Sequence, residues 1–223
     1  MLYVRLRVIR KKEIDMNTER TNIGWGFWLA WVLASVMGFV VGALLGLYVA
    51  YGFFDRDVFD ATIGIALGIV MGATAGCLQW VVLRQKVAQA GPWILASTLG
   101  FTITLGMLGA IGIGESNEDY VRAGILFAAV FGVAGGILQW LVLRRAGIPR
   151  AGLWVPANIF GSLVAGIGFP ISAAIGYSGN YALSGMMFGL LLGIGLGAIP
   201  GAVLAWLLRQ SPSSNIEGMA TAH

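Results

Sequence analysis

Five uncharged polar side chains recur at matching places in the apolar parts of the chain. They are two serines, two glutamines and an asparagine: Ser35, Gln79, Ser97, Gln139 and Asn158. Amides and hydroxyls donate and accept hydrogen bonds, but a hydroxyl is a weak nucleophile unless a neighbouring base activates it. The chemistry open to this set, here called the polar layer, is therefore hydrogen bonding, either between helices or to a bound polar group.

The spacing of the polar layer predicts one common depth. Ser35, Ser97 and Asn158 each follow a tryptophan by four residues, and Gln79 and Gln139 each precede an arginine by five. At about 1.5 Å per residue these intervals are about 6 Å and about 7.5 Å along a helix. Two interpretations are open. Hydrogen bonds between helices would each stabilise the bundle by about 0.6–2 kcal/mol. Alternatively, the layer forms a polar constriction or a headgroup site.

Charged side chains and histidine are absent from the six long apolar runs of the sequence. The runs are residues 26–54, 61–83, 93–114, 123–143, 154–176 and 183–208, and none contains Asp, Glu, Lys, Arg or His. Ion-coupled pumps and proton relays usually keep such residues inside the bundle. The runs also lack a histidine for haem, a metal-binding cluster and a nucleophile–base pair. We therefore expect no catalytic residue, no metal site and no cofactor.

Composition and charge indicate an integral membrane protein. Hydrophobic residues make up 58% of the chain and charged residues 11%, whereas soluble domains carry about 25% charged residues. Each apolar run is long enough to cross a bilayer. Twelve of the fourteen Lys and Arg residues fall in 1–22, 84–92, 144–153 and at Arg209, where the C-terminal tail begins. Basic loops face the cytoplasm, so we expect both termini there, in a bacterial cytoplasmic membrane. The net charge of +4 is thus a sign of topology, not of nucleic-acid binding.

The chain repeats itself three times. Residues 76–84 read Gly-Cys-Leu-Gln-Trp-Val-Val-Leu-Arg, residues 136–144 are nearly the same, and 201–209 are a degraded copy. A second motif, Trp-x-x-Ala-[Ser/Asn]-x-x-Gly, begins at Trp31, Trp93 and Trp154. These repeats predict an all-α membrane protein of six transmembrane helices. We expect three tandem parallel hairpins, 23–86, 87–147 and 148–209, packed as a pseudo-threefold bundle.

The ends of the chain are polar. Residues 1–22 are predicted to be a cytoplasmic N-terminal segment, in which Met16 is a second candidate start, and 210–223 a disordered cytoplasmic tail.

The repeated motifs resemble those of a group of uncharacterised bacterial polytopic membrane proteins. The resemblance is carried by Gln-Trp-x-Val-Leu-Arg at 79–84 and 139–144, followed by a basic loop and the tryptophan motif. It covers nearly the whole chain from Trp25 to Arg209, and the third copy departs from it at Leu204 and Ala205. The resemblance implies tandem hairpins and brings no established activity.

Glycines at four-residue spacing mark the second helix of each hairpin. Those predicted to pack against a neighbouring helix are Gly64, Gly68, Gly72, Gly76, Gly124, Gly132, Gly136, Gly189, Gly193, Gly197 and Gly201. Residues four apart lie on one face of a helix, and a face without side chains lets another backbone come close. Structural packing is our main interpretation. A narrow groove for a lipid or pigment tail is the alternative.

Tryptophans and arginines gather near the predicted cytoplasmic boundary. An interfacial aromatic belt is expected from Trp31, Trp80, Trp93, Trp140, Trp154 and Trp206. Arg84, Arg144 and Arg209 fit ordinary orientation charge, and binding of anionic headgroups is the alternative.

Three hypotheses for function follow from these patterns. The first is a non-enzymatic structural or accessory subunit, or a lipid-contacting scaffold, with membrane lipids and other membrane proteins as partners. The second is a channel or uncoupled transporter for a small neutral or apolar solute. A membrane enzyme comes third, because no catalytic group is visible. A polar layer that faces a pathway would favour the second hypothesis.

Overall fold

The protein is a bundle of long helices in a computed structural model, which describes residues 24–53, 60–112 and 117–210. Six of its helical segments are long and apolar enough to cross a membrane. No strand occurs within the described ranges. The predicted all-helical class and the predicted six membrane-crossing segments are thereby confirmed. The N-terminal segment 1–22, the tail from 211 and the possible start at Met16 lie outside the described residues.

The six segments are made of eight α-helices, a π-helical turn and a 3-10 turn. In chain order they are α2 (Trp25–Phe53), α3 (Ala61–Leu83), α4 (Pro92–Ala110), α5 (Asn117–Val130), the π-helical turn η1 (Phe131–Gly135), α6 (Gly136–Arg145), the 3-10 turn η2 (Ala151–Leu153), α7 (Trp154–Gly166), α8 (Gly168–Gly176) and α9 (Tyr181–Gln210). α5, η1 and α6 form one continuous segment. α7 and α8 together form another.

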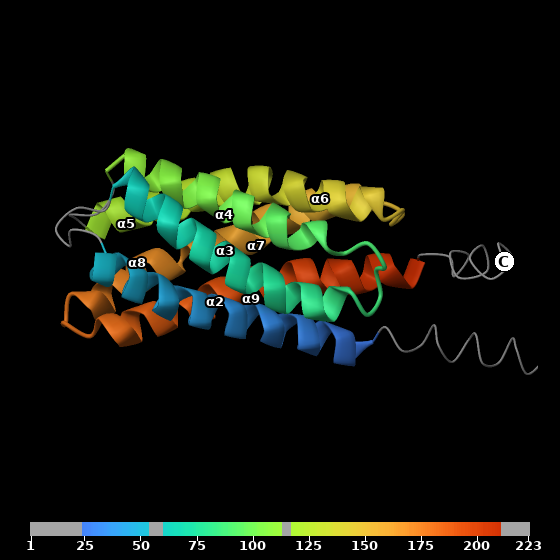
Figure 1. Cartoon of the computed structure of the whole chain (residues 1–223), viewed down its shortest axis with the longest axis horizontal. Helices are drawn as coiled ribbons and strands as arrows, with labels where there is room; N and C mark the ends of the chain where they lie inside the picture. The colour runs from blue at the N-terminus through green and yellow to red at the C-terminus, as the bar shows by residue number, and fades with distance from the viewer. Residues whose placement is uncertain (1–23, 54–59, 113–116, 211–223) are drawn as a thin grey trace, which may run out of the picture.

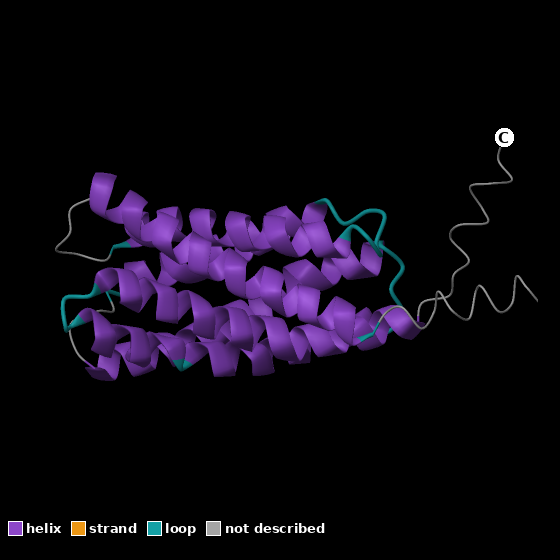
Figure 2. Ribbon diagram, turned by 90° about the horizontal axis from the view of Figure 1, so that it is seen from below, coloured by secondary structure: helices purple, strands orange, loops and turns teal. Residues whose placement is uncertain are grey.

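The segments alternate in direction along the long axis of the molecule (Figure 1). The described loops lie at the two ends of the bundle (Figure 2). The end where α2 begins and α9 finishes also holds the loops after α3 and α6. The basic residues 84, 86, 144, 145, 150 and 209 lie there, so we call it the basic end.

Local sequence explains where several helices begin and bend. Asp60 caps α3, because its carboxylate accepts a hydrogen bond from the backbone N–H of Ile63 at 2.9 Å. α5 begins at Asn117, so its first turn is polar and precedes the apolar run that starts at residue 123. Glu118 and Asp119 stand there, where carboxylates interact favourably with the helix dipole.

Two prolines in the later membrane-crossing segments, Pro170 and Pro200, behave differently. The chain turns between α7 and α8 at Ile167, three residues before Pro170. Pro170 has no N–H to donate to the carbonyl of Gly166, which favours a kink at this point. Pro200 does not end its helix, since α9 continues through it. The ring of Pro200 would lie 3.0 Å from a Cβ at Gly161, so the glycine accommodates it.

The helices form a closed ring. Each segment packs against the next one in the chain, and α9 returns to pack extensively on α2. The first and last segments are therefore neighbours.

The glycines at four-residue spacing lie at contacts between one hairpin and the next. A Cβ at Gly72 of α3 would lie 2.7 Å from the Cα of Thr98 in α4. A Cβ at Gly132 would lie 2.9 Å from the Cα of Ile159 in α7. The other glycines of the sequence-derived set face backbone or side-chain atoms of the same neighbours: Gly64, Gly68 and Gly76 face α4, Gly124 and Gly136 face α7, and Gly189, Gly193, Gly197 and Gly201 face α2. These positions leave no room for a side chain.

Candidate functional site

Gln79 on α3 joins the first two hairpins inside the bundle. Its amide nitrogen donates to the hydroxyl of Ser35 on α2 at 3.0 Å. Its amide oxygen accepts from the indole N–H of Trp93 on α4, also at 3.0 Å. Gln79, Ser35 and Trp93 are all buried. One amide thus bonds within its own hairpin through its nitrogen and to the next hairpin through its oxygen.

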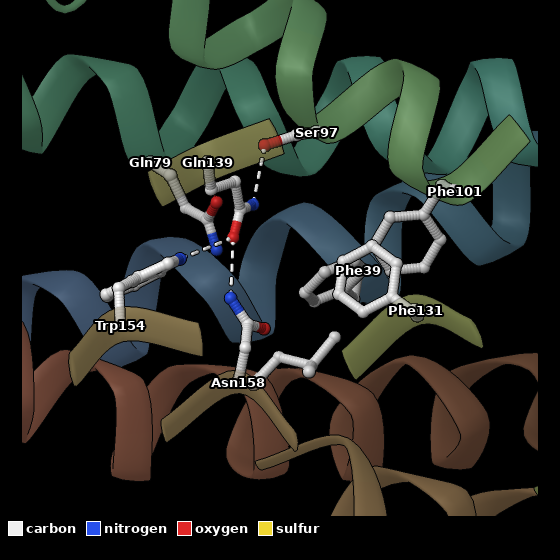
Figure 3. Close-up of a pocket in the computed structure, with 9 residues that line it drawn as sticks. Phe39, Gln79, Ser97, Phe101, Phe131, Gln139, Trp154 and Asn158 are labelled. Atoms are coloured by element: carbon white, nitrogen blue, oxygen red, sulfur yellow. Dashed lines mark hydrogen bonds between the residues drawn. The ribbon is translucent and has the colours of Figure 1, made fainter. Parts of the chain in front are cut away.

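Gln139 on α6 repeats the arrangement one hairpin later. Its nitrogen donates to the hydroxyl of Ser97 at 3.1 Å, and its oxygen accepts from the indole of Trp154 on α7 at 3.1 Å. The oxygen also accepts from the side-chain nitrogen of Asn158 at 2.8 Å. Figure 3 shows Gln139 between Ser97 and Asn158. The structure therefore brings all five members of the polar layer into two hydrogen-bonded groups.

The third junction, from α9 to α2, lacks this bond. Leu204 occupies the position in its repeat that Gln79 and Gln139 occupy in theirs. Trp31 is fully buried, and its indole nitrogen has no hydrogen-bond partner among the described residues. A Cβ at Gly201 would lie 2.5 Å from Cδ1 of the Trp31 ring, so α9 lies directly against the indole.

Trp31, Trp93 and Trp154 meet in the middle of the ring. Their ring centroids are 5.5 Å apart for Trp31 and Trp93, 5.3 Å for Trp93 and Trp154, and 6.2 Å for Trp31 and Trp154. All three pairs are edge-to-face, a favourable aromatic geometry. The expectation that these three tryptophans form an interfacial belt is wrong. Their exposed fractions are 1% or less.

The sequence held a signal for this burial. Each of these tryptophans precedes Ser35, Ser97 or Asn158 by four residues, and residues four apart share one face of a helix. If the polar residue points into the bundle, its tryptophan must do so as well.

A small cavity adjoins the polar layer on the side away from the basic end. It has a volume of about 10 Å³ and is lined by Phe39, Gln79, Ser97, Phe101, Phe131, Gln139, Trp154, Asn158 and Leu196. That volume is about the space that one water molecule needs. The side-chain oxygen of Asn158 points away from Gln139, to which the Asn158 nitrogen donates (Figure 3).

Phenylalanine rings close the bundle beyond the cavity. Phe39 and Phe101 lie 5.0 Å apart, and Phe101 lies 4.4 Å from Phe131 in the π-helical turn. Sequence reasoning missed these rings, although Phe39 and Phe101 follow Trp31 and Trp93 by eight residues. At the matching third position stands Ser162, which is fully buried, and its hydroxyl has no partner among the described residues.

The residues predicted to be interfacial lie at the basic end. The guanidinium of Arg84 lies 4.7 Å from the ring centroid of Trp80, and that of Arg144 lies 5.4 Å from Trp140. Trp206 instead lies 5.9 Å from Arg150. Trp80 and Trp140 are half-buried and Trp206 is exposed, as is Arg209. Whether they meet a bilayer boundary stays a prediction, because no membrane is present.

The site can bind by hydrogen bonds and by shape, and it holds no titratable group. In the described part of the chain, no three His, Cys, Asp or Glu side chains come together to hold a metal ion. The chain matches no known family model. It also matches no solved structure. Function must therefore be argued from the geometry of this polar layer and its surroundings.

Proposed function

We propose that the protein is a non-enzymatic scaffold of a bacterial cytoplasmic membrane, acting as a structural or accessory subunit that contacts lipids and other membrane proteins. The observation that carries the proposal is that the hydrogen bonds of the polar layer join one helix to another. Gln79 and Gln139 each bind a side chain of their own hairpin and a tryptophan of the next. Buried amides used in this way hold helices together.

We further infer that the three hairpins are tandem repeats related by a pseudo-threefold axis. Three kinds of contact support the inference: the second helix of each hairpin packs by its glycines on the first helix of the next, two of the three junctions share the glutamine–tryptophan bond, and the tryptophans of the three first helices meet one another. The basic end would face the cytoplasm with both termini, as the distribution of Lys and Arg indicates.

The competing function, a channel or uncoupled transporter, needs a pathway through the ring. The polar layer does lie inside the bundle, as that hypothesis requires. However, the three tryptophans fill the centre beside it, and phenylalanines pack beyond it. The cavity between them, with about 10 Å³, is no larger than one water molecule. The geometry favours a sealed bundle.

The test is flux through purified protein in phosphatidylcholine liposomes. We expect no conduction of ions and no uptake of small polar solutes. Gln79→Leu combined with Gln139→Leu should lower the stability of the bundle without opening a leak, because the amides bind helices and do not line a path. Reproducible flux through the wild-type protein that the double substitution abolishes would reject the scaffold and favour the transporter.

A further inference from the structure

Two arginines at the basic end lie over indole rings of their own helices. Arg84 follows Trp80 by four residues on α3, and Arg144 follows Trp140 by four on α6, so each pair shares a helix face. The guanidinium-to-centroid distances of 4.7 Å and 5.4 Å are within the range of cation–π contacts. The same pair thus occurs in the first two hairpins.

The charge at this end is not balanced by carboxylates of the described chain. The described basic residues there are Arg84, Lys86, Arg144, Arg145, Arg150 and Arg209. The described acidic residues, Asp60, Glu118 and Asp119, all belong to the opposite end. Neither Arg84 nor Arg144 contacts a carboxylate within the described ranges. The two stacked guanidinium groups therefore retain charge to offer a partner.

Stacking determines which kind of partner fits. A guanidinium that lies on an aromatic face keeps the N–H groups of its edge free, in a planar fork that matches the oxygens of a phosphate. Trp80 and Trp140 are half-buried, and exposed apolar residues are close to them in the same helices: Val81 follows Trp80, and Ile137 precedes Trp140 by three residues. A fitting ligand therefore has a phosphate and an apolar chain on one molecule.

We propose that Arg84 with Trp80, and Arg144 with Trp140, form two binding sites for the phosphate headgroup of an anionic phospholipid. The proposal rests on the membrane location of the proposed scaffold and names its lipid partner. Arg150 over Trp206 is a weaker third site, because its guanidinium already donates to the side-chain oxygen of Gln210 at 3.0 Å.

The chain offers a matched control for the experiment. Arg145 is adjacent to Arg144, and Lys86 lies two residues after Arg84; all four side chains are exposed. Of these four residues, only Arg84 and Arg144 lie over an indole. The double variant Arg84→Gln with Arg144→Gln removes the same charge as Lys86→Gln with Arg145→Gln, so the pair separates a shaped site from general attraction to a charged surface.

The measurement is lipid binding by the intact protein in nanodiscs of phosphatidylcholine, with and without phosphatidylglycerol. Native mass spectrometry counts retained phosphatidylglycerol, and thermal unfolding reports the shift that it causes. We expect the wild-type protein to retain phosphatidylglycerol and to unfold at a higher temperature with it. Loss of each stacked arginine should weaken retention about fivefold. The control variant should keep most of it.

Three outcomes would overturn the proposal. Equal loss in both double variants would mean diffuse attraction to the surface, and no preference for phosphatidylglycerol in the wild-type protein would mean no site. Inorganic phosphate that raises the unfolding temperature in phosphatidylcholine as much as the anionic lipid does would mean a site for soluble anions.

A lysine series tests the fork itself, and a flux measurement separates this proposal from the scaffold. Arg84→Lys with Arg144→Lys keeps the charge but loses the planar edge, so retention should fall between the wild type and the glutamine variant. Full retention would contradict the role of the fork.

The flux test uses liposomes of phosphatidylcholine alone. In them, the Arg84→Gln with Arg144→Gln variant and the Lys86→Gln with Arg145→Gln variant should both stay sealed. Failure of the lipid sites would leave that result intact, and a leak would count only against the scaffold.

Discussion

Trp31 on α2 and Leu204 on α9 are not joined by a hydrogen bond. At each of the other two junctions, the corresponding tryptophan and glutamine are joined by one. Trp93 donates to Gln79 and Trp154 donates to Gln139, whereas Trp31 donates to no described residue. A buried donor without an acceptor costs about 1–3 kcal/mol. The junction that closes the ring is therefore the least satisfied of the three.

Leu204→Gln should repair this junction. The new amide oxygen would accept from Trp31. Its nitrogen would donate to the side-chain oxygen of Asn158, which belongs to the same hairpin as α9, as the nitrogens of Gln79 and Gln139 donate within their own hairpins. We expect the free energy of unfolding in detergent to rise by about 0.5–1.5 kcal/mol relative to Leu204→Met, which keeps the volume but adds no amide. If Leu204→Gln is less stable than Leu204→Met, the comparison of the third repeat with the first two fails at this position.

Loss of Gln139 should cost more than loss of Gln79. Gln139→Leu removes the acceptor of Trp154 and Asn158, whereas Gln79→Leu removes that of Trp93 alone. The additional orphaned donor is worth about 1–3 kcal/mol, so Gln139→Leu should unfold at a clearly lower temperature. Equal effects of the two substitutions would show that Asn158 finds another acceptor, or that its bond contributes little.

Glycines that touch a backbone should not tolerate a side chain. Gly132→Leu places a branched chain where even a Cβ would lie 2.9 Å from the Cα of Ile159, and overpacking costs about 1–3 kcal/mol or more. Ile125→Leu, at a site that is 63% exposed, is the control. Thermal unfolding in detergent should separate the two by several degrees. Wild-type stability of Gly132→Leu would mean that this helix contact does not form.

Single cysteines should report the orientation of the bundle. In a Cys77→Ala background, Ser178→Cys lies at the end away from the basic end, and Ala146→Cys lies in a loop at the basic end. An impermeant thiol reagent added to intact cells should label position 178 and leave position 146 unlabelled until the cells are opened. The reverse pattern would place the basic end outside.

Depth and helix number were predictable from the sequence, because they depend on one-dimensional properties. Apolar runs predicted six helices long enough to cross a membrane. The intervals from Trp and Arg put the glutamines at the level of the serines, and Gln79 donates to Ser35 as Gln139 does to Ser97. The four-residue glycine spacing predicted a close contact. It did not identify the partner, since Gly72 could have faced either adjacent helix.

Whether a side chain points into the bundle or out of it was harder to predict. Tryptophan is common both at membrane interfaces and in buried cores. Trp93 was assigned to the interface from its depth in the membrane alone. Its burial depends on which helices pack against it, and depth does not predict that. The π-helical turn at Phe131 and the continuity of α9 through Pro200 depend on packing against other helices. Such features have no local sequence requirement that singles them out.

The pairing of α2 with α9 sets the order in which the protein can be assembled during synthesis. Gly193 rests on the backbone of Val36, which leaves the ribosome long before it. Until α9 has entered the bilayer, the face of α2 that carries Val36 has no partner from its own chain. A nascent chain that stops before Tyr181 would expose that face. Assembly of this ring therefore waits for the synthesis of α9, and a copy that lacks α9 differs from a complete ring by this uncovered face of α2.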